Sequence, residues 1–591
     1  MSSAALFRRP WQLVFLLAAA VMMLAVACDG GDDDDATSTA TPDAGGGDGS
    51  PTASATAPDA GDLTDEQVLR VAIDGEPGAI DPQRGTDTDS IALLRQLYAG
   101  LLRLDENQVI QPDLATEVPT VENGGISEDG LTYTFHLKDG LMWSDGTPLV
   151  AQAFVDGAKR LFEPGSANYY ADFYRVIAAG GAQPEYQTAV ADGLEGDDLR
   201  PFEQAVVDQL EVEAPDDQTV VYHLNAQSPI FPLLATLWTL YPVRQDIVDS
   251  AGDAWTEAGT LVSNGPFALS SWNHDQDLTL VKNEFSHRAP LLDEISIDII
   301  PDFAVAFLAY QQDELDVIKL GPEELVQVRG TELVDDFQNY AQLSTIGWYY
   351  NFEDPILQDD NVRLALTAGV DRAEYAEVVR EGAVLPAYGW VPPGMPGHDP
   401  EVGMEFRDAI EQAQQWLVDA GFPDGEGLEL EILGADSSLG IQRDEWLKEQ
   451  WEANLGITVT IRTLDRATYF AERNLGNYQI TTGGWGADYP DPQNWMPLFQ
   501  TGHGLNPGKY SNADFDALIV AADTELDNDA RIELYLQAQE ILISEAGFAP
   551  MYYNGRQILV KPWVQGLVAS SMESNMPGDL FFDLVYIDGR S

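Results

Sequence analysis

The sequence predicts a mixed α/β protein that folds into two or three lobes. Its 591 residues exceed the size at which a single hydrophobic core stops growing, so more than one lobe is expected. From about Glu66 onward, strand patterns alternate with helix patterns, and no internal repeat is visible. Together these observations indicate a large globular protein with both kinds of secondary structure.

Alternating apolar and polar side chains predict strands at three places. The clearest alternation runs from Leu131 to Leu137, and shorter ones lie at 295–299 and 457–461. A period of two residues is typical of a half-buried strand, because successive side chains point to opposite faces of the sheet.

Two segments carry helix patterns. Asp371 and Glu374 have the spacing of a capping box, which predicts a helix that starts there and runs through Val379. Apolar residues between 534 and 542 are spaced to share one face of a second helix.

The N-terminus has the three parts of an export signal. Arg8 and Arg9 precede an apolar run, and small residues lead to Cys28. Residues 1–27 are therefore predicted to be a lipoprotein signal peptide, and Cys28 is predicted to carry a diacylglycerol group after cleavage. Plain secretion and an uncleaved membrane anchor are the alternatives.

The segment after the cysteine, residues 28–65, consists mainly of Asp, Thr, Ala, Pro, Ser and Gly. It cannot bury enough apolar surface to fold and is predicted to be a flexible acidic tether. Beyond it no apolar run is long enough to span a bilayer. The protein is expected outside the cytoplasm, held to the outer face of the cell membrane by one end, or in a periplasm if a second membrane exists.

The formal net charge of −68 argues against nucleic acid as a partner, because an acidic surface repels phosphate. The charge has two interpretations: a solvated surface suited to the exterior, or attraction of cationic ligands. Cys28 is the only cysteine, so neither an intramolecular disulfide nor a multi-cysteine metal site is possible. No cofactor is predicted.

Motifs for catalysis are absent from the sequence. It contains no His-Glu-x-x-His zinc motif and no Gly-x-Ser-x-Gly nucleophile elbow, and its six histidines are scattered. A secreted hydrolase that uses paired carboxylates stays the alternative from the enzyme class. A binding protein is the favoured interpretation.

Five blocks of sequence resemble, in order, the extracytoplasmic solute-binding proteins of peptide ABC transporters, solute-binding protein family 5. The resemblance extends over nearly all of residues 66–591 and is most specific where Leu-Thr-Tyr-Thr-Phe-His-Leu-Lys-Asp-Gly is followed by Trp-Ser-Asp-Gly-Thr-Pro-Leu. The blocks lie at 79–101, 131–149, 263–267, 361–393 and 484–492.

The resemblance implies a periplasmic-binding-protein-like fold of the large three-lobed form (type II), with two hinged α/β lobes and an inserted third lobe. The expected first lobe is discontinuous, the inserted lobe interrupts it, and the second ligand-binding lobe is continuous. By position these lobes are 66–98 with 219–335 and 556–591, then 99–218, then 336–555.

The resemblance also implies a ligand site. In peptide-binding relatives, an Asp in a Gly-Trp-x-x-Asp segment contacts the α-amine of the ligand, and this motif falls here on Asp488. A buried ammonium group needs such a partner, because an unpaired charge removed from water costs several kcal/mol. The alternative is that Asp488 caps a turn. The neighbouring residues of the motif are expected to line the cleft: Trp485, Gly486 and Ala487.

The glycines of this motif, including Gly484, are expected to let the backbone approach the ligand closely. Thr482 departs from the oligopeptide-binding pattern, in which an arginine precedes the motif, so the way the carboxyl end of a ligand is held stays open.

Four further residues are candidates for the cleft. Thr88, Tyr170 and Tyr349 are expected in its walls, with a place in the hydrophobic core as the alternative for the aromatic side chains. Lys319 is a candidate partner for a ligand carboxylate, with a solvated lysine as the alternative.

The resemblance implies a monomeric substrate-binding lipoprotein of an ABC importer, which captures oligopeptides by hinge closure and delivers them to a membrane permease. Other solutes carried by the fold in relatives are alternatives: an oligosaccharide, a nickel complex, haem or an opine. A sensor that reports the ligand to a receptor is a further alternative.

Overall fold

The computed structural model describes residues 63, 65–164, 169–191, 193–194 and 196–590. The predicted signal peptide, the lipidation site Cys28 and nearly all of the predicted tether lie outside these residues. Among the helices that are described, none combines the length and the apolar character that crossing a membrane requires.

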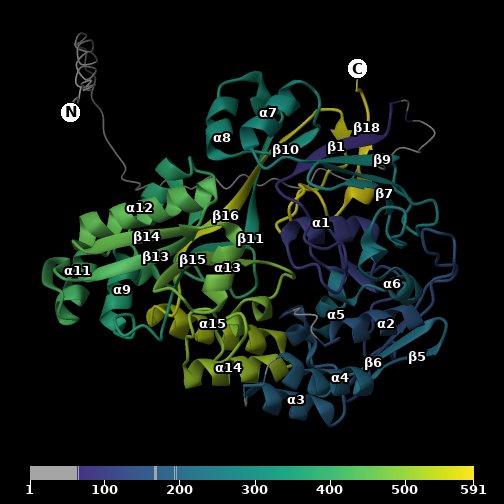
Figure 1. Ribbon diagram of the computed structural model, residues 1–591, viewed down its shortest axis with the longest axis horizontal. Helices are drawn as coiled ribbons and strands as arrows, with labels where there is room; N and C mark the ends of the chain where they lie inside the picture. The colour runs from purple at the N-terminus through teal and green to yellow at the C-terminus, as the bar shows by residue number, and fades with distance from the viewer. Residues whose placement is uncertain (1–62, 64, 165–168, 192, 195, 591) are drawn as a thin grey trace, which may run out of the picture. The chain divides into compact units, whose positions relative to one another are not determined.

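The described chain contains one large mixed sheet of eleven strands (Figure 1). Parallel pairs join β1 to β9 and β10 and join β13 to β14 and β15, while the other pairs are antiparallel. Ten strands follow the order β14 (Thr458–Leu464), β13 (Glu429–Ala435), β15 (Ile480–Gly486), β11 (Phe337–Tyr350), β16 (Ala549–Val560), β10 (Val317–Lys319), β1 (Val68–Ile73), β9 (Glu294–Ile299), β8 (Asp277–Lys282) and β7 (Phe267–Asn273), and β12 (Leu385–Pro386) pairs with β16.

Two long neighbouring strands, β11 and β16, connect the two halves of this sheet. The start of β11 pairs with the end of β16, beside β10. The end of β11 pairs with the start of β16 and, on its other edge, with β15. The β11–β16 register shifts between Ala341 and Thr345, and such an irregularity bends a strand locally. We call β11 and β16 the connecting strands.

A small antiparallel sheet forms the centre of the inserted part of the chain. Its order is β4 (Thr132–His136), β6 (Thr219–His223) and β5 (Val212–Asp216). Because β6 is the middle strand, residues 219–223 belong to this small sheet, and the predicted lobe boundary at 219 is wrong by at least these residues. Two-stranded sheets are formed by β2 (Leu102–Leu104) with β3 (Ile110–Pro112) and by β17 (Val564–Gln565) with β18 (Tyr586–Ile587).

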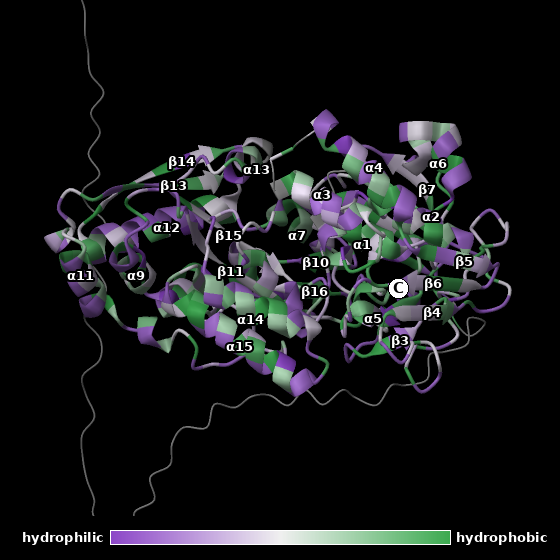
Figure 2. Ribbon diagram, turned by 90° about the horizontal axis from the view of Figure 1, so that it is seen from below, coloured by the Kyte–Doolittle hydropathy of each residue, from purple (hydrophilic) through white to green (hydrophobic). Residues whose placement is uncertain are grey.

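Fifteen α-helices are described around these sheets (Figure 1). In Figure 2 the ribbons of α14 and α15 carry hydrophobic and hydrophilic residues in turn, as helices with one packed face do. In chain order the helices are α1 (Thr88–Leu97), α2 (Gln152–Leu161), α3 (Ala182–Ala191), α4 (Arg200–Gln209), α5 (Phe231–Leu234), α6 (Gln245–Ala251), α7 (Phe303–Gln311), α8 (Pro322–Val328), α9 (Asp360–Ala368), α10 (Arg372–Glu374), α11 (Ile410–Asp419), α12 (Ser438–Leu455), α13 (Arg466–Asn474), α14 (Ala513–Thr524) and α15 (Asn528–Ser544).

The sequence patterns agree with these elements. The three predicted strands correspond to β4, β9 and β14, and the helical pattern at 534–542 lies within α15. Asp371 caps its helix by accepting a hydrogen bond from the backbone N–H of Glu374. That helix differs from the expected one, because α10 spans three residues and continues as a π-helical turn from Tyr375 to Val379.

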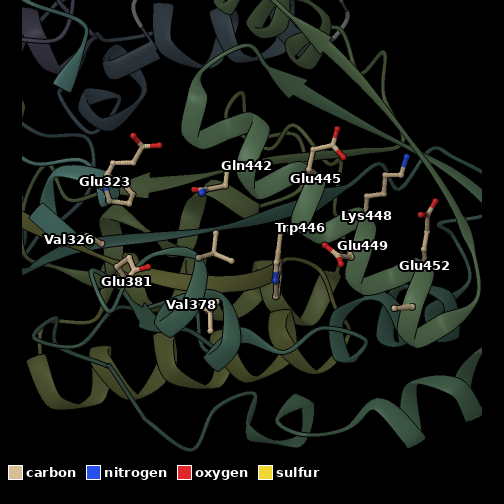
Figure 3. A pocket seen from close by; sticks show the side chains of 13 residues that line it. Glu323, Val326, Val378, Glu381, Gln442, Glu445, Trp446, Lys448, Glu449 and Glu452 are labelled. Atoms are coloured by element: carbon tan, nitrogen blue, oxygen red, sulfur yellow. The ribbon is translucent and has the colours of Figure 1, made fainter. Parts of the chain in front are cut away.

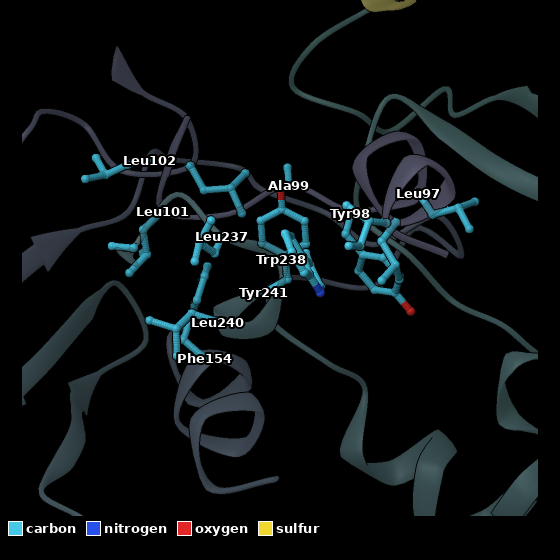
Figure 4. Packing of buried hydrophobic residues seen from close by; sticks show 14 of the residues in the cluster. Leu97, Tyr98, Ala99, Leu101, Leu102, Phe154, Leu237, Trp238, Leu240 and Tyr241 are labelled. Atoms are coloured by element: carbon cyan, nitrogen blue, oxygen red, sulfur yellow. The ribbon is translucent and has the colours of Figure 1, made fainter. Parts of the chain in front are cut away.

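Two large hydrophobic clusters form the core. One extends from β1 and β9 to the small sheet of β4, β5 and β6, and it includes Tyr98, Trp238 and Tyr241, which pack together (Figure 4). The other fills the part built on β13, β15 and the far ends of the connecting strands. The first and last described segments meet in the fold, because the side chain of Gln67 donates to the carbonyl of Ile587 and accepts from its N–H, both at 2.9 Å.

Candidate ligand-binding site

Strand β15 delivers the Gly-Trp-x-x-Asp motif to the bend in the connecting strands. Gly484 and Trp485 pair with Ile346 and Thr345 of β11. A Cβ atom on Gly484 would lie 1.9 Å from the carbonyl oxygen of Thr345, so only glycine fits there. The backbone of β11 therefore requires glycine here, and Gly484 also lines the cavity described below, so its expected close approach to a ligand stays a prediction.

The Asp488 carboxylate is buried and hydrogen-bonded. Its side chain accepts from the Tyr170 hydroxyl at 2.9 Å and from Asn494 Nδ2 at 3.1 Å. Asn494 Oδ1 in turn accepts from the Asp488 N–H at 2.8 Å and from Trp485 Nε1 at 3.2 Å. One asparagine thus fixes both the aspartate and the tryptophan of the motif.

No ion pair to Asp488 occurs among the described residues. The residue is only 8% exposed, and burial raises the pKa of its carboxyl to about 6. Hydrogen bonds from Asn494 and Tyr170 act in the opposite direction. A buried carboxylate without a cation beside it is costly, and a cationic ligand group would stabilise it.

Asp488 faces a cavity of about 330 Å³ to which each part of the fold contributes. Helix α1, the inserted part, the connecting strands, the β15 motif and a loop near the C-terminus all line it. The lining residues are Thr86, Thr88, Ile91, Arg95, Tyr170, Trp238, Gln342, Leu343, Ser344, Ile346, Gly484, Trp485, Gly486, Ala487, Asp488, Asn554, Arg556, Ser571, Met572, Glu573 and Ser574.

Two arginines in the cavity wall already have acidic partners. Arg95 Nη1 lies 3.3 Å from the carboxylate of Asp579, and Arg556 Nε lies 3.3 Å from that of Glu573. Both carboxyls are buried, and burial raises their pKa. Because each arginine is neutralised by its acidic partner, Asp488 is the one charged group of the lining without an ion-pair partner in the described part of the chain. This suits a ligand with one cationic group.

Sequence reasoning missed the part of the cavity wall formed by Arg95 and the loop at 571–574. Arg95 lies inside a block that carries the family resemblance, so its place in a helix beside the cleft could have been predicted. The loop at 571–574 has no recognisable pattern, and it joins the site through contacts that span more than 470 residues, such as the hydrogen bond from Arg95 Nη1 to Ser574 Oγ at 2.8 Å.

Most of the predicted site residues line this one cavity. They are Thr88, Tyr170, Trp485, Gly486, Ala487 and Asp488.

Tyr349 and Lys319 do not line the cavity. Tyr349 is 4% exposed and packs in the core with its ring centroid 6.0 Å from that of Phe499, as the alternative interpretation predicted. Lys319 is neither a lining residue nor a solvated lysine. Its Nζ lies 2.5 Å from Asp74 in an ion pair and also donates to Asn575.

The family model described as "Bacterial extracellular solute-binding proteins, family 5 Middle" matches residues 109–506, about two thirds of the sequence. The chain belongs to this family. The predicted fold class and the prediction of a binding protein instead of an enzyme are thereby confirmed. Membership also supports an extracytoplasmic location.

Curated relatives match along most of their length. The periplasmic murein peptide-binding protein MppA of Escherichia coli is 29% identical over 519 residues, covering 86% of this chain and 92% of MppA. The probable deoxycholate-binding periplasmic protein YgiS of E. coli is 28% identical, covering 85% and 91%. The oligopeptide-binding protein OppA of Bacillus subtilis is 28% identical, covering 89% and 93%.

Solved structures of family members have the same fold as this chain. The murein tripeptide-binding protein MppA of E. coli superposes with a TM-score of 0.77 at 27% identity, covering 89% of this chain and all of MppA. The unliganded open form of MppA gives a TM-score of 0.66 at 26% identity, covering 89% and 98%. The structure of this chain is thus less similar to the open form of MppA than to the first MppA structure.

Proposed function

We propose that this protein is the lipid-anchored substrate-binding protein of an ABC importer and that it captures peptides through their free amino-terminal ammonium group. The observation that carries the proposal is the buried Asp488 carboxylate, which has no ion-pair partner among the described residues and faces a cavity lined by every part of the fold. Asp488 accepts the ammonium group, and Tyr170 and Asn494 hold the carboxylate in place.

The cavity favours a short ligand. Its volume of about 330 Å³ lies at the lower end of the range for small-molecule sites, ~300–1,000 Å³. Residues of β11 and β15 line it, so an extended peptide would lie along these two strands. The names of MppA and OppA, a murein peptide-binding and an oligopeptide-binding protein, support a peptide as the solute.

Capture proceeds by closure about the connecting strands. The Tyr170 hydroxyl, on the inserted part, bonds Asp488 beyond β15, so the two sides of the cavity already touch. A ligand that bridges these sides stabilises the closed form by the contacts it makes only there. The closed, monomeric protein then delivers the solute to the permease, while the lipid on Cys28 keeps it at the membrane surface.

Other solutes are separated from peptides by the charge they bring to Asp488. An oligosaccharide brings no cation, whereas an opine or a metal complex could bring one. The relative named as probably binding deoxycholate shows that family resemblance alone leaves the solute open. A role as a sensor differs in the partner and not in the ligand site.

Native mass spectrometry of the purified protein tests the proposal. Denaturation in the instrument should release short peptides with free amino termini. A single sugar, sterol or metal chelate would contradict the peptide assignment. The mass of the N-terminal fragment from a bacterial membrane fraction should show a diacylglycerol group on Cys28, and an unmodified thiol would contradict the anchor.

A further inference from the structure

A second, larger hollow lies away from the ligand cavity. It is a groove of about 830 Å³ between α8, the π-helical turn at 375–379 and α12 (Figure 3). We call it the acidic groove. Its lining residues are Pro322, Glu323, Val326, Val378, Val379, Glu381, Gln442, Glu445, Trp446, Lys448, Glu449, Glu452 and Ala453.

The floor of the acidic groove exposes apolar side chains. Val378 is 65% exposed and Val326 is 49% exposed, and the ring of Trp446 lies between α12 and the turn that carries Val378 (Figure 3). Exposed apolar residues scattered singly need no explanation, but here two of them share one hollow with the edge of a tryptophan that is itself only 8% exposed.

The rim is acidic and largely unpaired. Five glutamates line the groove against one lysine. Among the described residues, Glu323, Glu445 and Glu449 take part in no ion pair, whereas Glu381 pairs with Arg329 at 3.6 Å. Glu445 and Glu449 stand one turn apart on α12, and like charges at this spacing destabilise a helix.

The groove crosses the boundary that the connecting strands bridge. Helix α8 follows β10 in the first half of the large sheet, whereas α12 lies between β13 and β14 in the other half. The Arg329–Glu381 ion pair spans the same boundary. A partner seated in the groove therefore touches both halves, and its affinity depends on how they are placed.

We propose that the acidic groove binds a cationic amphipathic segment of a partner protein. Apolar residues of that segment pack on Val326, Val378 and Trp446, and its basic side chains neutralise the unpaired glutamates. A second copy of this chain would bring the same glutamates, and an anionic lipid surface would bring phosphate, so charge disfavours both. If the proposed function holds, the partner is the importer, and the groove lets it distinguish the ligand-bound protein.

The test uses a fluorescent peptide of about 18 residues in which lysines and leucines are arranged on opposite faces of a helix. A control peptide has the same composition in an order that gives no apolar face. Anisotropy titrations with the full chain near physiological salt, about 0.15 M, should give tighter binding of the amphipathic peptide.

Three variants locate the binding. The triple variant Glu323→Gln, Glu445→Gln, Glu449→Gln should weaken it about tenfold, since each exposed charge contributes modestly, and Val378→Ser should weaken it about threefold. A control triple, Glu405→Gln, Glu411→Gln, Glu540→Gln, makes the same charge change at exposed positions outside the groove and should have less than a twofold effect.

Equal losses in the two triple variants, or equal binding of the two peptides, would show general attraction to an acidic protein and overturn the proposal. Repeating the titration with a saturating short peptide ligand tests the link between groove and cavity, and we expect a threefold or larger change in affinity. An unchanged affinity would overturn that link. Failure of the short peptide to bind the cavity would contradict the proposed function and leave the comparison of variants valid.

Discussion

Replacing Asp488 with asparagine should have opposite effects on ligand binding and on stability. The asparagine keeps the size of the side chain and can still accept from Asn494 and donate to the Tyr170 oxygen. It removes the charge that the ligand ammonium requires. Loss of one member of a buried ion pair costs about 3 to 5 kcal/mol, on the order of a hundredfold to a few thousandfold in Kd.

The stability effect follows from the pKa of the carboxyl. Burial raises it from 3.8 to about 6, so the folded, ligand-free protein resists ionisation of Asp488. This difference corresponds to about 3 kcal/mol of stability, which is present below pH 4 and lost as the pH rises through 6. Asp488→Asn should therefore unfold at a higher urea concentration than the wild type at pH 8, and at a similar one at pH 4.

Isothermal titration calorimetry with a short free-amine peptide and urea unfolding of the ligand-free protein measure the two effects. The matched control is Asp523→Asn. Burial also raises the pKa of Asp523 to about 6, and Tyr535 donates to it at 2.9 Å, yet it lies outside the ligand cavity. Wild-type affinity in Asp488→Asn, or an equal loss of affinity in both variants, would refute the role of Asp488.

Three further predictions follow from the site and its support. Peptide affinity should fall up to tenfold per pH unit below about pH 6, because Asp488 is protonated there. It should fall again above about pH 8, because the ligand amine loses its proton. Calorimetry that gives the same affinity from pH 5 to pH 7 would contradict this. Gly484→Ala should destabilise the protein by about 1 to 3 kcal/mol or more in urea unfolding, because the added Cβ meets the Thr345 carbonyl. Gly486→Ala is the control and should be tolerated, because its Cβ has no neighbour nearer than 3.9 Å. Asp81→Ala should cost about 3 to 5 kcal/mol by leaving the buried Arg160 guanidinium unpaired, and a small shift in the urea midpoint would argue against that pair as a structural element.

The residues that sequence reasoning placed in the site are those that lie within a local motif. Trp485 and Asp488 stand on one short segment, so recognising the segment locates both. Tyr349 shows the limit of local patterns. Trp348, Tyr349 and Tyr350 are all buried, because both faces of β11 are covered there, and no alternation reveals which side chain faces a cavity.

Long-range pairing explains the remaining misses. Arg95 meets Asp579 across 484 positions of the sequence, and Lys319 meets Asp74 across 245. The sequence around Arg95 or Lys319 does not indicate the partner residue, so the ion pair of Lys319 with Asp74 could not be predicted. The lobe boundary at 219 failed for the same reason, since the sheet to which β6 belongs depends on β4 and β5.

The meeting of Gln67 with Ile587 has a consequence for how the protein matures. Strand β1 pairs with β10, β10 pairs with β16, and the C-terminal loop closes the ligand cavity. The part of the large sheet that contains β1 is therefore complete only when β16 and the C-terminal segments have been added. If the chain is exported from its N-terminus, this half cannot finish folding until translocation ends, whereas the continuous stretch between the connecting strands can begin earlier. The ligand site is then the last part of the molecule to form, so solute is bound only by protein that has fully left the cytoplasm.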